Sequence, residues 1–208
     1  MSKETYTAQE KFWAGDFGSE YICRNQASEN VVFNVHLFAR ALRFTRNIRT
    51  CLEFGANVGH NLKALGILYP EMKFQGIEIN KDAASELGRA IGHNNVFNQS
   101  ILNWRPKEAV ELVLVKGVLI HINPDKLMDI YQSLYEASSR YILVCEYYNP
   151  SPVELDYRGH SGQLFKRDFA GEMMNAFSNL QLVDYGFIYQ GDSRSLKEDL
   201  HWFLMEKQ

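Results

Sequence analysis

Four residues in the segment TCLEFGANVGHNLKALG could hold a ligand: Glu53, Gly55, Asn57 and Gly59. They lie between a short apolar run and a run with helical periodicity, which is the pattern of a strand that turns into a helix. Glycine permits a sharp turn and a close approach of a ligand to the backbone. Asparagine is one of the few other residues that tolerate a positive φ. The spacing therefore predicts a ligand-binding turn, although an ordinary structural turn would also explain it.

The order of the residues in this turn argues against two common phosphate-binding loops. A dinucleotide-binding turn has the spacing G-x-G-x-x-G, and a triphosphate-binding loop has G-x-x-x-x-G-K-[ST]. Neither spacing is present around Gly55. Glu53 lies at the end of the strand, where a carboxylate would repel a pyrophosphate and would suit a ligand that carries a cationic group.

A second acidic residue, Glu78, follows the next strand-like run in GIEI. An acid roughly 20 residues beyond such a turn can accept hydrogen bonds from both hydroxyls of a ribose. A solvated strand end is the alternative interpretation of Glu78. A ligand with a ribose and a cationic group, but without a pyrophosphate, matches S-adenosylmethionine, in which an adenosine is joined to a sulfonium and an amino-acid tail.

Strand-like and helix-like patterns alternate along the chain and would position these residues. The strand-like runs are 51–55, 72–79, 95–99, 110–117, 141–148, 180–188 and 201–206. The helix-like runs between them are 59–69, 81–92, 124–138 and 167–177. This order predicts an α/β fold, Rossmann-like and doubly wound, with a mostly parallel seven-stranded sheet and an antiparallel C-terminal edge hairpin. Segment 149–165 is predicted to be a polar loop.

The N-terminal part is predicted to be a short helical extension, 1–47, before the Rossmann-like domain, 48–208. Its opening segment is rich in aromatic residues and is expected to form a short helix followed by a loop. Ser28 is expected to cap the next helix. The aromatic residues favour a lid over the ligand, and a helix packed on the sheet edge explains them equally well.

Composition excludes several classes of function. The chain of 208 residues has a net charge of −3 and a pI of about 6.1, which argues against a nucleic-acid partner. Its polar N-terminus argues against export, and no run approaches the roughly 18 apolar residues of a membrane span. Three widely spaced cysteines, without a CxxC pair, predict neither disulfides nor a metal site. A cytoplasmic protein is expected.

With these residues the sequence resembles class I S-adenosylmethionine-dependent methyltransferases. The run from Glu53 to Gly59 is similar to the first motif of that family, with Asn57 in place of the frequent middle glycine. The resemblance implies that Ser100 and Ile101 contact the adenine, although the usual acidic residue is missing there, and that segment 114–122 lines the methyl-transfer site. The expected cofactor-binding residues are Glu53, Gly55, Ala56, Asn57, Gly59, Glu78, Ile79, Ser100, Ile101, Lys116, Gly117, Val118, Trp13 and Arg24.

Three segments carry a narrower resemblance: FWAGDFGSEYICRN, LEFGANVGHNLKAL and FKRDFAGEMM. They are similar to the small methylases associated with pseudaminic acid biosynthesis. This resemblance implies methylation of a small polar acceptor, at a hydroxyl or amine of a nonulosonic acid, a sugar nucleotide or an acyl substituent. The expected protein is a monomer or homodimer that binds a small molecule and neither a nucleic acid nor a membrane.

Two histidines could take the proton of a hydroxyl acceptor, because imidazole titrates near neutral pH. His121 follows the fourth strand on the ligand side, and His160 is the second candidate; a packing histidine is the alternative. Arg158 could pair with a carboxylate of the acceptor. The expected acceptor-binding residues, which could instead be core aromatics or parts of a solvated loop, are Tyr147, Tyr148, Asn149, Tyr157 and Arg158.

Two other functions stay open. One is a nucleoside-binding module of the same fold that catalyses nothing. The other is a nicotinamide-dependent oxidoreductase, against which the glycine spacing argues.

Overall fold

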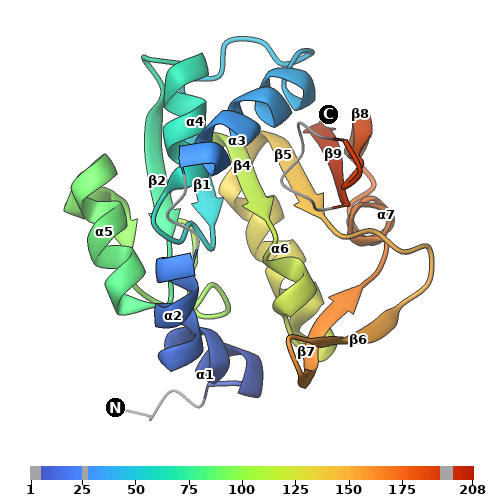
Figure 1. Ribbon diagram of the computed structural model, residues 1–208. Helices are drawn as coiled ribbons and strands as arrows, with labels where there is room; N and C mark the ends of the chain where they lie inside the picture. Colours follow the sequence, from blue (N-terminus) through green and yellow to red (C-terminus); the bar gives the residue numbers. More distant parts are fainter. Residues whose placement is uncertain (1–5, 25–27, 193–198) are drawn as a thin grey trace.

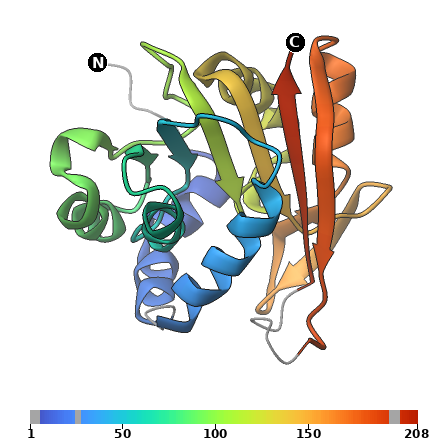
Figure 2. The ribbon, with the colours of Figure 1, turned by 90° about the horizontal axis from the view of Figure 1, so that it is seen from above.

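The computed structural model describes residues 6–24, 28–192 and 199–208, and its centre is a seven-stranded sheet of order β3-β2-β1-β4-β5-β9-β8. β1 to β5 pair in parallel, whereas β9 is antiparallel to both β5 and β8 (Figure 2). The prediction of a mostly parallel sheet with an antiparallel edge hairpin is thus confirmed. The strands are β1 (Thr50–Phe54), β2 (Lys73–Ile77), β3 (Val96–Phe97), β4 (Val110–Lys116), β5 (Ser138–Glu146), β8 (Leu180–Ile188) and β9 (Leu200–Lys207).

Helices cover both faces of this sheet (Figure 1). Helices α3 (Ser28–Ala41) and α4 (His60–Leu68) pack on one face, and α6 (Leu127–Ala137) and α7 (Phe169–Ala176) pack on the other. The middle strands are therefore apolar on both sides, as expected for a covered parallel sheet. β4 shows this directly, because alternate residues of its run 112–115 enter the two separate hydrophobic cores.

The loops and caps that connect these elements follow the sequence signals. Asn80 caps α5 (Lys81–Ile91) by accepting hydrogen bonds from the amides of Asp82 and Ala83. Gly92 then ends α5 with a φ of 88°. Before α6, Asn123 caps the short 3-10 turn η3 (Pro124–Lys126), where Pro124 occupies the first position.

Two predicted loops are wrong. Segment 149–165 contains a hairpin of β6 (Val153–Tyr157) and β7 (His160–Lys166). Its turn residues, Arg158 and Gly159, both have positive φ, which is the conformation of a tight hairpin turn. The largely polar, exposed composition of the two strands hides them from hydrophobic periodicity.

The other wrong loop follows α1 (Ala8–Ala14), where the chain forms a second helix, α2 (Asp16–Arg24). Only Gly15 separates the two helices, and Gly18 lies inside α2. Glycine in this segment therefore does not prevent helix formation. Ser28 opens α3 as its position predicted, but its side chain lies outside the described residues, so its capping bond stays a prediction.

Helices α1 and α2 lie beyond the arrowheads of β1 and β4, beside the β6–β7 hairpin (Figure 1). This is the carboxyl edge of the parallel strands, where the strand order reverses between β1 and β4. Open α/β sheets bind ligands at such a switch point. The fold therefore brings the turn after β1, the N-terminal helices and the hairpin together at one edge.

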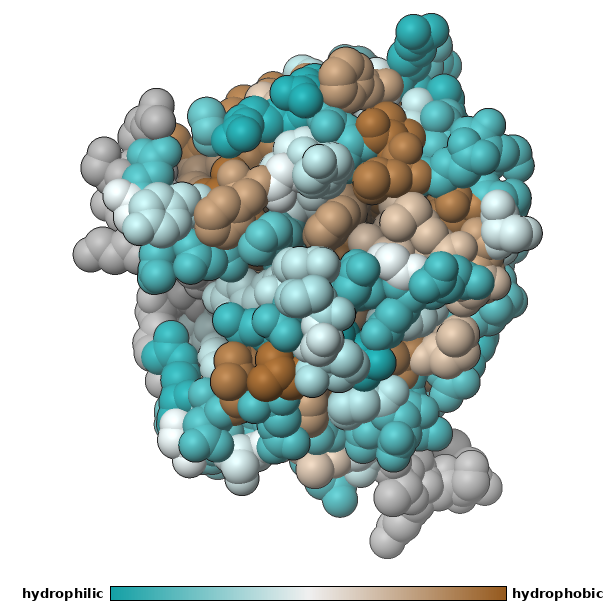
Figure 3. All heavy atoms as spheres, turned by 90° about the vertical axis from the view of Figure 1, so that its right-hand side faces the viewer, coloured by the Kyte–Doolittle hydropathy of each residue, from teal (hydrophilic) through white to brown (hydrophobic). Residues whose placement is uncertain are grey.

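β8 is one of the two edge strands of the sheet, and β3 is the other. Tyr185 and Phe187 are 66% and 44% exposed there. On the face that Figure 3 shows, apolar side chains lie in separate groups among polar ones, outside the grey residues. Among the helices that the structure describes, none has the length and apolar character needed to cross a membrane.

Candidate functional site

The turn after β1 has the left-handed conformations that its residue types predicted. The φ angles are 71° at Gly55, 48° at Asn57 and 86° at Gly59. A Cβ atom at Gly55 would lie 2.5 Å from Cγ2 of Val118, so this glycine also allows the close approach of the segment that follows β4. The side chain of Asn57 supports its own turn by accepting a hydrogen bond from the amide of Val58 at 2.8 Å.

Glu78 joins the turns that follow β1 and β2. One of its carboxylate oxygens accepts a hydrogen bond from the amide of Asn57, and the other accepts one from the amide of Asn80, both at 2.8 Å. Burial raises the pKa of Glu78, and the amides of Asn80, Asn57 and Ile79 oppose that rise. Each oxygen keeps a lone pair for a ligand hydroxyl.

Glu53 is fully buried behind Asn61, a residue that the sequence reasoning missed. Asn61 Nδ2 donates a hydrogen bond of 2.5 Å to Glu53 Oε1. The second oxygen, Oε2, is buried and has no hydrogen-bond partner in the described part of the chain. Burial raises the pKa of Glu53 to about 8, against the opposing effects of the Asn61 hydrogen bond and the Lys116 ammonium. Oε2 of Glu53 is therefore free to accept a hydrogen bond from a cationic group of a ligand.

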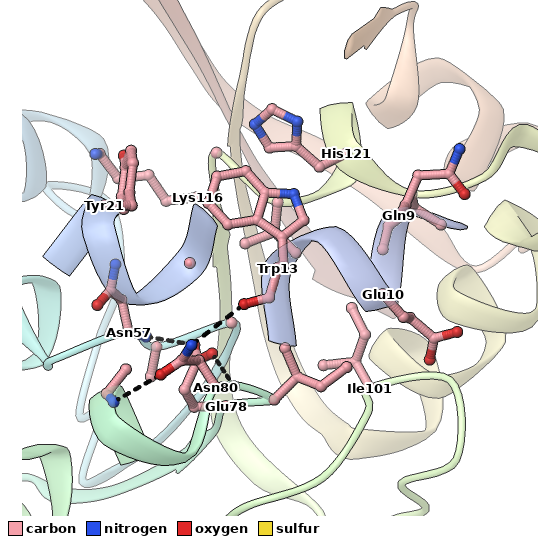
Figure 4. A pocket seen from close by; sticks show the side chains of 18 of the residues that line it. Gln9, Glu10, Trp13, Tyr21, Asn57, Glu78, Asn80, Ile101, Lys116 and His121 are labelled. Carbon is pink, nitrogen blue, oxygen red and sulfur yellow. Dashed lines mark hydrogen bonds between the residues drawn. The ribbon is translucent and has the colours of Figure 1, made fainter. Parts of the chain in front are cut away.

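Glu78 and most of the turn after β1 line a cavity of about 230 Å³ at the carboxyl edge of the sheet (Figure 4). Most of the expected cofactor-binding residues line it, together with His121. Glu53 and Gly59 do not line it, and the side chain of Arg24, the last residue of α2, lies outside the described residues. The expected residues that line the cavity are Trp13, Gly55, Ala56, Asn57, Glu78, Ile79, Ser100, Ile101, Lys116, Gly117, Val118 and His121.

Helix α1 forms one wall of the cavity through polar contacts that the sequence reasoning missed. The carboxylate of Glu10 accepts hydrogen bonds from the hydroxyl of Ser100 and from the amide of Thr7. Gln9 Nε2 donates to the carbonyl of Gly162 in β7 at 2.8 Å. The pair Thr7 and Glu10 is a capping box, so the pattern T-x-x-E was the available signal for this helix start.

Trp13 stands in the middle of this wall, between Tyr21 and Gln9 (Figure 4). Its ring centroid lies 4.7 Å from that of His121 and 6.3 Å from that of Tyr157. Its carbonyl accepts a hydrogen bond of 3.4 Å from Asn80 Nδ2. The N-terminal segment is therefore tied both to the turn after β2 and to the hairpin.

His121 is the last residue of the 3-10 turn η2 (Leu119–His121) and is 7% exposed. Its Nδ1 lies 2.6 Å from the carbonyl oxygen of Gln163. A carbonyl only accepts hydrogen bonds, so Nδ1 carries the proton and Nε2 keeps a lone pair. Burial lowers the pKa of His121 to about 4, although the Gln163 carbonyl opposes this. The imidazole is neutral at physiological pH.

The other residues expected at the acceptor side do not line the cavity. Tyr157 contacts its wall through His121, at 4.8 Å between ring centroids. His160 is exposed and packs against Phe12 at 5.0 Å between centroids. Arg158 lies exposed in the hairpin turn, with its guanidinium 5.8 Å from the Tyr157 ring.

The residues that follow β5 lie farther along the sheet edge. Lys166 Nζ is 5.2 Å from the Tyr147 ring, and Tyr148 packs against His201 and Phe203. Asn149 donates a hydrogen bond to the carbonyl of Ser151. The structure therefore brings Tyr157 near His121, whereas Tyr147 lies against β7, Tyr148 against β9 and Asn149 against Ser151.

Two further buried polar residues lie at or beside the cavity, Asn34 in its wall and Glu146 outside it. Asn34, on α3, lines the cavity and is 3% exposed, and its Oδ1 has no hydrogen-bond partner among the described residues. Glu146, at the end of β5, accepts hydrogen bonds of 2.9 Å from the amides of Val118 and Leu119. Burial raises the pKa of Glu146 to about 7, against these hydrogen bonds. The sequence signal for Glu146 was an acid directly after the apolar run 141–145, whereas α3 contains several other polar residues and gave no such signal for Asn34.

No family model matches the sequence, and no curated protein matches it either. The fold, in contrast, is similar to several solved structures. A methyltransferase from Leishmania major that depends on S-adenosylmethionine has a TM-score of 0.69 at 16% identity, over 95% of this chain and 81% of that chain. The Burkholderia thailandensis 1,6-didemethyltoxoflavin-N1-methyltransferase, with 1,6-didemethyltoxoflavin and S-adenosylhomocysteine bound, has a TM-score of 0.71 at 12% identity, over 99% and 93%.

A third similar structure is the magnesium protoporphyrin IX methyltransferase from Synechocystis PCC 6803 with bound S-adenosylmethionine. Its TM-score is 0.67 at 9% identity, and the match covers 100% of both chains. At these identities the comparisons show the fold, which is the Rossmann-like fold of class I methyltransferases. The function has to be argued from the site.

Proposed function

We propose that this protein is an S-adenosylmethionine-dependent methyltransferase that acts on a small polar acceptor. One observation carries the proposal. In a methyltransferase fold, the turn after β1, Glu78 after β2 and residues 116–118 at the end of β4 line one cavity at the switch point of the sheet. Each of these segments was expected from the sequence to touch the cofactor.

The polar groups around the cavity fit this cofactor. Glu78, Ser100 and Ile101 line the cavity. Glu78 would accept hydrogen bonds from the ribose hydroxyls, and Ser100 and Ile101 would contact the adenine. Near the turn after β1, Glu53 Oε2 and Asn34 Oδ1 are buried acceptors without a partner in the described residues. Buried acceptors normally have partners, and an ammonium group of an amino-acid tail would supply them. A pyrophosphate would meet the carboxylates of Glu78 and Glu10 instead.

When bound, S-adenosylmethionine supplies a methyl group that the sulfonium charge already activates. The chain would supply alignment and the exclusion of water. Helices α1 and α2 cover the carboxyl edge of the sheet, so the acceptor would be enclosed (Figure 1). Nε2 of His121 would accept the proton of a hydroxyl nucleophile, since Nδ1 is already engaged with Gln163. His160 is the reserve base and would need the hairpin to move.

For the acceptor, we propose a hydroxyl or amine of a nonulosonic, pseudaminic-type acid, of a sugar nucleotide or of an acyl substituent. This part rests on the resemblance of the three sequence segments. The exposed guanidinium of Arg158, in the turn between β6 and β7, could pair with a carboxylate of the acceptor. Tyr157 and the residues 147–149 remain the proposed acceptor contacts. A cytoplasmic location and a monomer or homodimer belong to the same proposal.

Calorimetric titration with S-adenosylhomocysteine tests cofactor binding. We expect saturable binding by the native chain. Glu78→Ala should weaken it by roughly 1–3 kcal/mol, which is about 5- to 150-fold, because a buried charged acceptor is lost. Glu71→Ala, which removes an exposed carboxylate, is the matched control and should not change the affinity. A folded native chain that shows no saturable heat would overturn the proposal.

Catalysis is tested by mass spectrometry. Purified protein and a donor with a labelled methyl group are incubated with pools of sugar nucleotides and nonulosonic acids. A labelled product identifies the acceptor, and His121→Gln should reduce its rate of formation by at least about 100-fold if His121 is the base. Binding of S-adenosylhomocysteine without any methylated product would favour the nucleoside-binding module instead.

A further inference from the structure

Glu146 is a buried carboxylate that does not line the cavity. It ends β5, is 2% exposed, and faces the core that contains the apolar β5 residues Ile142 and Val144. Burying a charged group costs free energy unless hydrogen bonds compensate it. Apolar packing therefore does not explain why an acid ends this strand. Its hydrogen bonds indicate its structural role.

Both hydrogen bonds of Glu146 go to the start of η2. Oε1 accepts from the amides of Val118 and Leu119, each at 2.9 Å. The first amides of a helical turn have no partner within the turn, so the carboxylate satisfies them. η2 is a turn of only three residues, and its third residue is His121. Fixing its first amides therefore fixes the backbone of His121.

The ring of His121 is held separately. Its Nδ1 donates to the carbonyl of Gln163 in β7 at 2.6 Å. The two supports come from different elements, one from the end of β5 and one from the hairpin. Losing the first would let the imidazole leave the hydrogen bond that selects its tautomer.

We infer that Glu146 is the positioning residue for His121, holding η2 so that Nε2 presents its lone pair to the cavity. The inference rests on the proposed function for the role of His121 as proton acceptor. It does not depend on the identity of the acceptor, because the position and tautomer of the imidazole can be measured directly.

The experiment is long-range proton–nitrogen NMR of protein labelled with ¹⁵N-histidine, at about pH 8, where the carboxyl with a pKa of about 7 is ionised. His121→Gln assigns the resonances. We expect a protonated Nδ1 and an unprotonated Nε2 in the native chain. In Glu146→Ala the two nitrogen signals should move toward each other as tautomers mix. Amide exchange of Val118 and Leu119 should accelerate by roughly tenfold or more.

Two variants separate positioning from general stability. Glu146→Gln keeps an oxygen that can accept both amides, so it should restore the native signals. Val144→Ala lies on the same strand and faces the same core, but it makes no bond to η2. It should lower the free energy of unfolding and leave the His121 signals unchanged. Unchanged tautomer signals in Glu146→Ala, or an equal change in Val144→Ala, would overturn the inference.

Calorimetry with S-adenosylhomocysteine on the same samples distinguishes failure of the positioning role of Glu146 from failure of the proposed function. If the native chain binds the compound and Glu146→Ala leaves the imidazole unaltered, only the positioning role is lost. If the native chain does not bind it, the proposed function is lost, whatever the NMR result.

Discussion

The turn after β1 and the N-terminal cover of helices α1 and α2 bound the same cavity in different ways. The turn consists of consecutive residues whose conformations follow from residue type, with positive φ at Gly55, Asn57 and Gly59. The cover depends on partners far away in the chain, since Gln9 bonds to Gly162, 153 residues later. The cofactor side of the cavity is thus local, and the other side is assembled by tertiary contacts.

This difference predicts different responses to mutation. The two glycines of the turn combine left-handed backbone with close packing, because an added Cβ would lie 2.5 Å from Cγ2 of Val118 at Gly55 and 2.7 Å from Cδ1 of Leu87 at Gly59. The cover is held by aromatic contacts of partly exposed side chains, each of which contributes modestly. Substitutions of these two glycines should therefore affect the whole fold, whereas changes in the cover should affect mainly the site.

The largest effect is expected for Gly55→Val. The left-handed conformation costs about 1–2 kcal/mol for a residue with a side chain, and overpacking adds about 1–3 kcal/mol. The new Cβ would lie 2.5 Å from Cγ2 of Val118. Urea unfolding should show a loss of roughly 3 kcal/mol or more.

The control for this change is Gly66→Ala in α4. A Cβ there meets the Phe74 ring at 3.6 Å, an ordinary contact. Alanine should stabilise the helix by up to about 1 kcal/mol. Equal losses of unfolding free energy in Gly55→Val and Gly66→Ala would show that the glycine in the turn is no more sensitive to substitution than a glycine in a helix.

Trp13→Ala tests the cover. The side chain is only partly buried, so the loss should be about 2 kcal/mol, below the roughly 3–5 kcal/mol of a fully buried tryptophan. The variant should bind S-adenosylhomocysteine more weakly because the cavity loses a wall. Urea unfolding and calorimetry measure both effects, with the exposed Phe44→Ala as a neutral reference. Native affinity in Trp13→Ala would show that the cover takes no part in binding.

Proton release should accompany cofactor binding. The pKa of Glu53 in the free protein is about 8, raised mainly by burial. A bound ammonium would favour the ionised carboxylate and lower this pKa. Affinity for S-adenosylhomocysteine should therefore rise with pH, by up to about tenfold per unit between roughly pH 6 and 8.

For the free protein the same raised pKa has the opposite consequence. The contribution of Glu53 to stability is fully present below its ordinary pKa of 4.5 and is lost as pH rises through about 8.

Calorimetry in buffers of different ionisation enthalpy counts the protons that the protein releases when it binds S-adenosylhomocysteine. Glu53→Gln is the matched control and should release none. Equal proton release by the native chain and Glu53→Gln would exclude Glu53 as the group that senses the cation.

The smallest effect is expected at Asn57, where the sequence departs from the glycine frequent in class I methyltransferases. Its φ is 48°, so Asn57→Ala should cost about 1 kcal/mol and Asn57→Gly only a few tenths. Asn57 bonds to Glu78 through its backbone amide, which both variants keep. Affinity for S-adenosylhomocysteine should therefore stay native in Asn57→Gly. A large loss would assign the Asn57 side chain a direct role.

The sequence alone determined the features that depend on neighbouring residues. Short apolar runs predicted the strands of the large sheet. Gly92 and Asn123 lie at helix ends, as their residue types indicate. The turn after β1 and the position of Glu78 were predictable because they depend on backbone conformation and strand order. The β6–β7 hairpin was missed, since exposed strands show no hydrophobic periodicity and its two-residue turn contains arginine rather than the usual asparagine.

Only the tertiary structure decided which distant groups meet. Trp13 from α1, Tyr157 from β6 and Gln163 from β7 contact His121 although long stretches of chain separate them. Asn61 screens Glu53, and Glu146 holds η2, through contacts that no spacing encodes. The physical reason is that a hydrogen bond or a ring contact depends on three-dimensional proximity, whereas residue type fixes only what a group can bind once it is there.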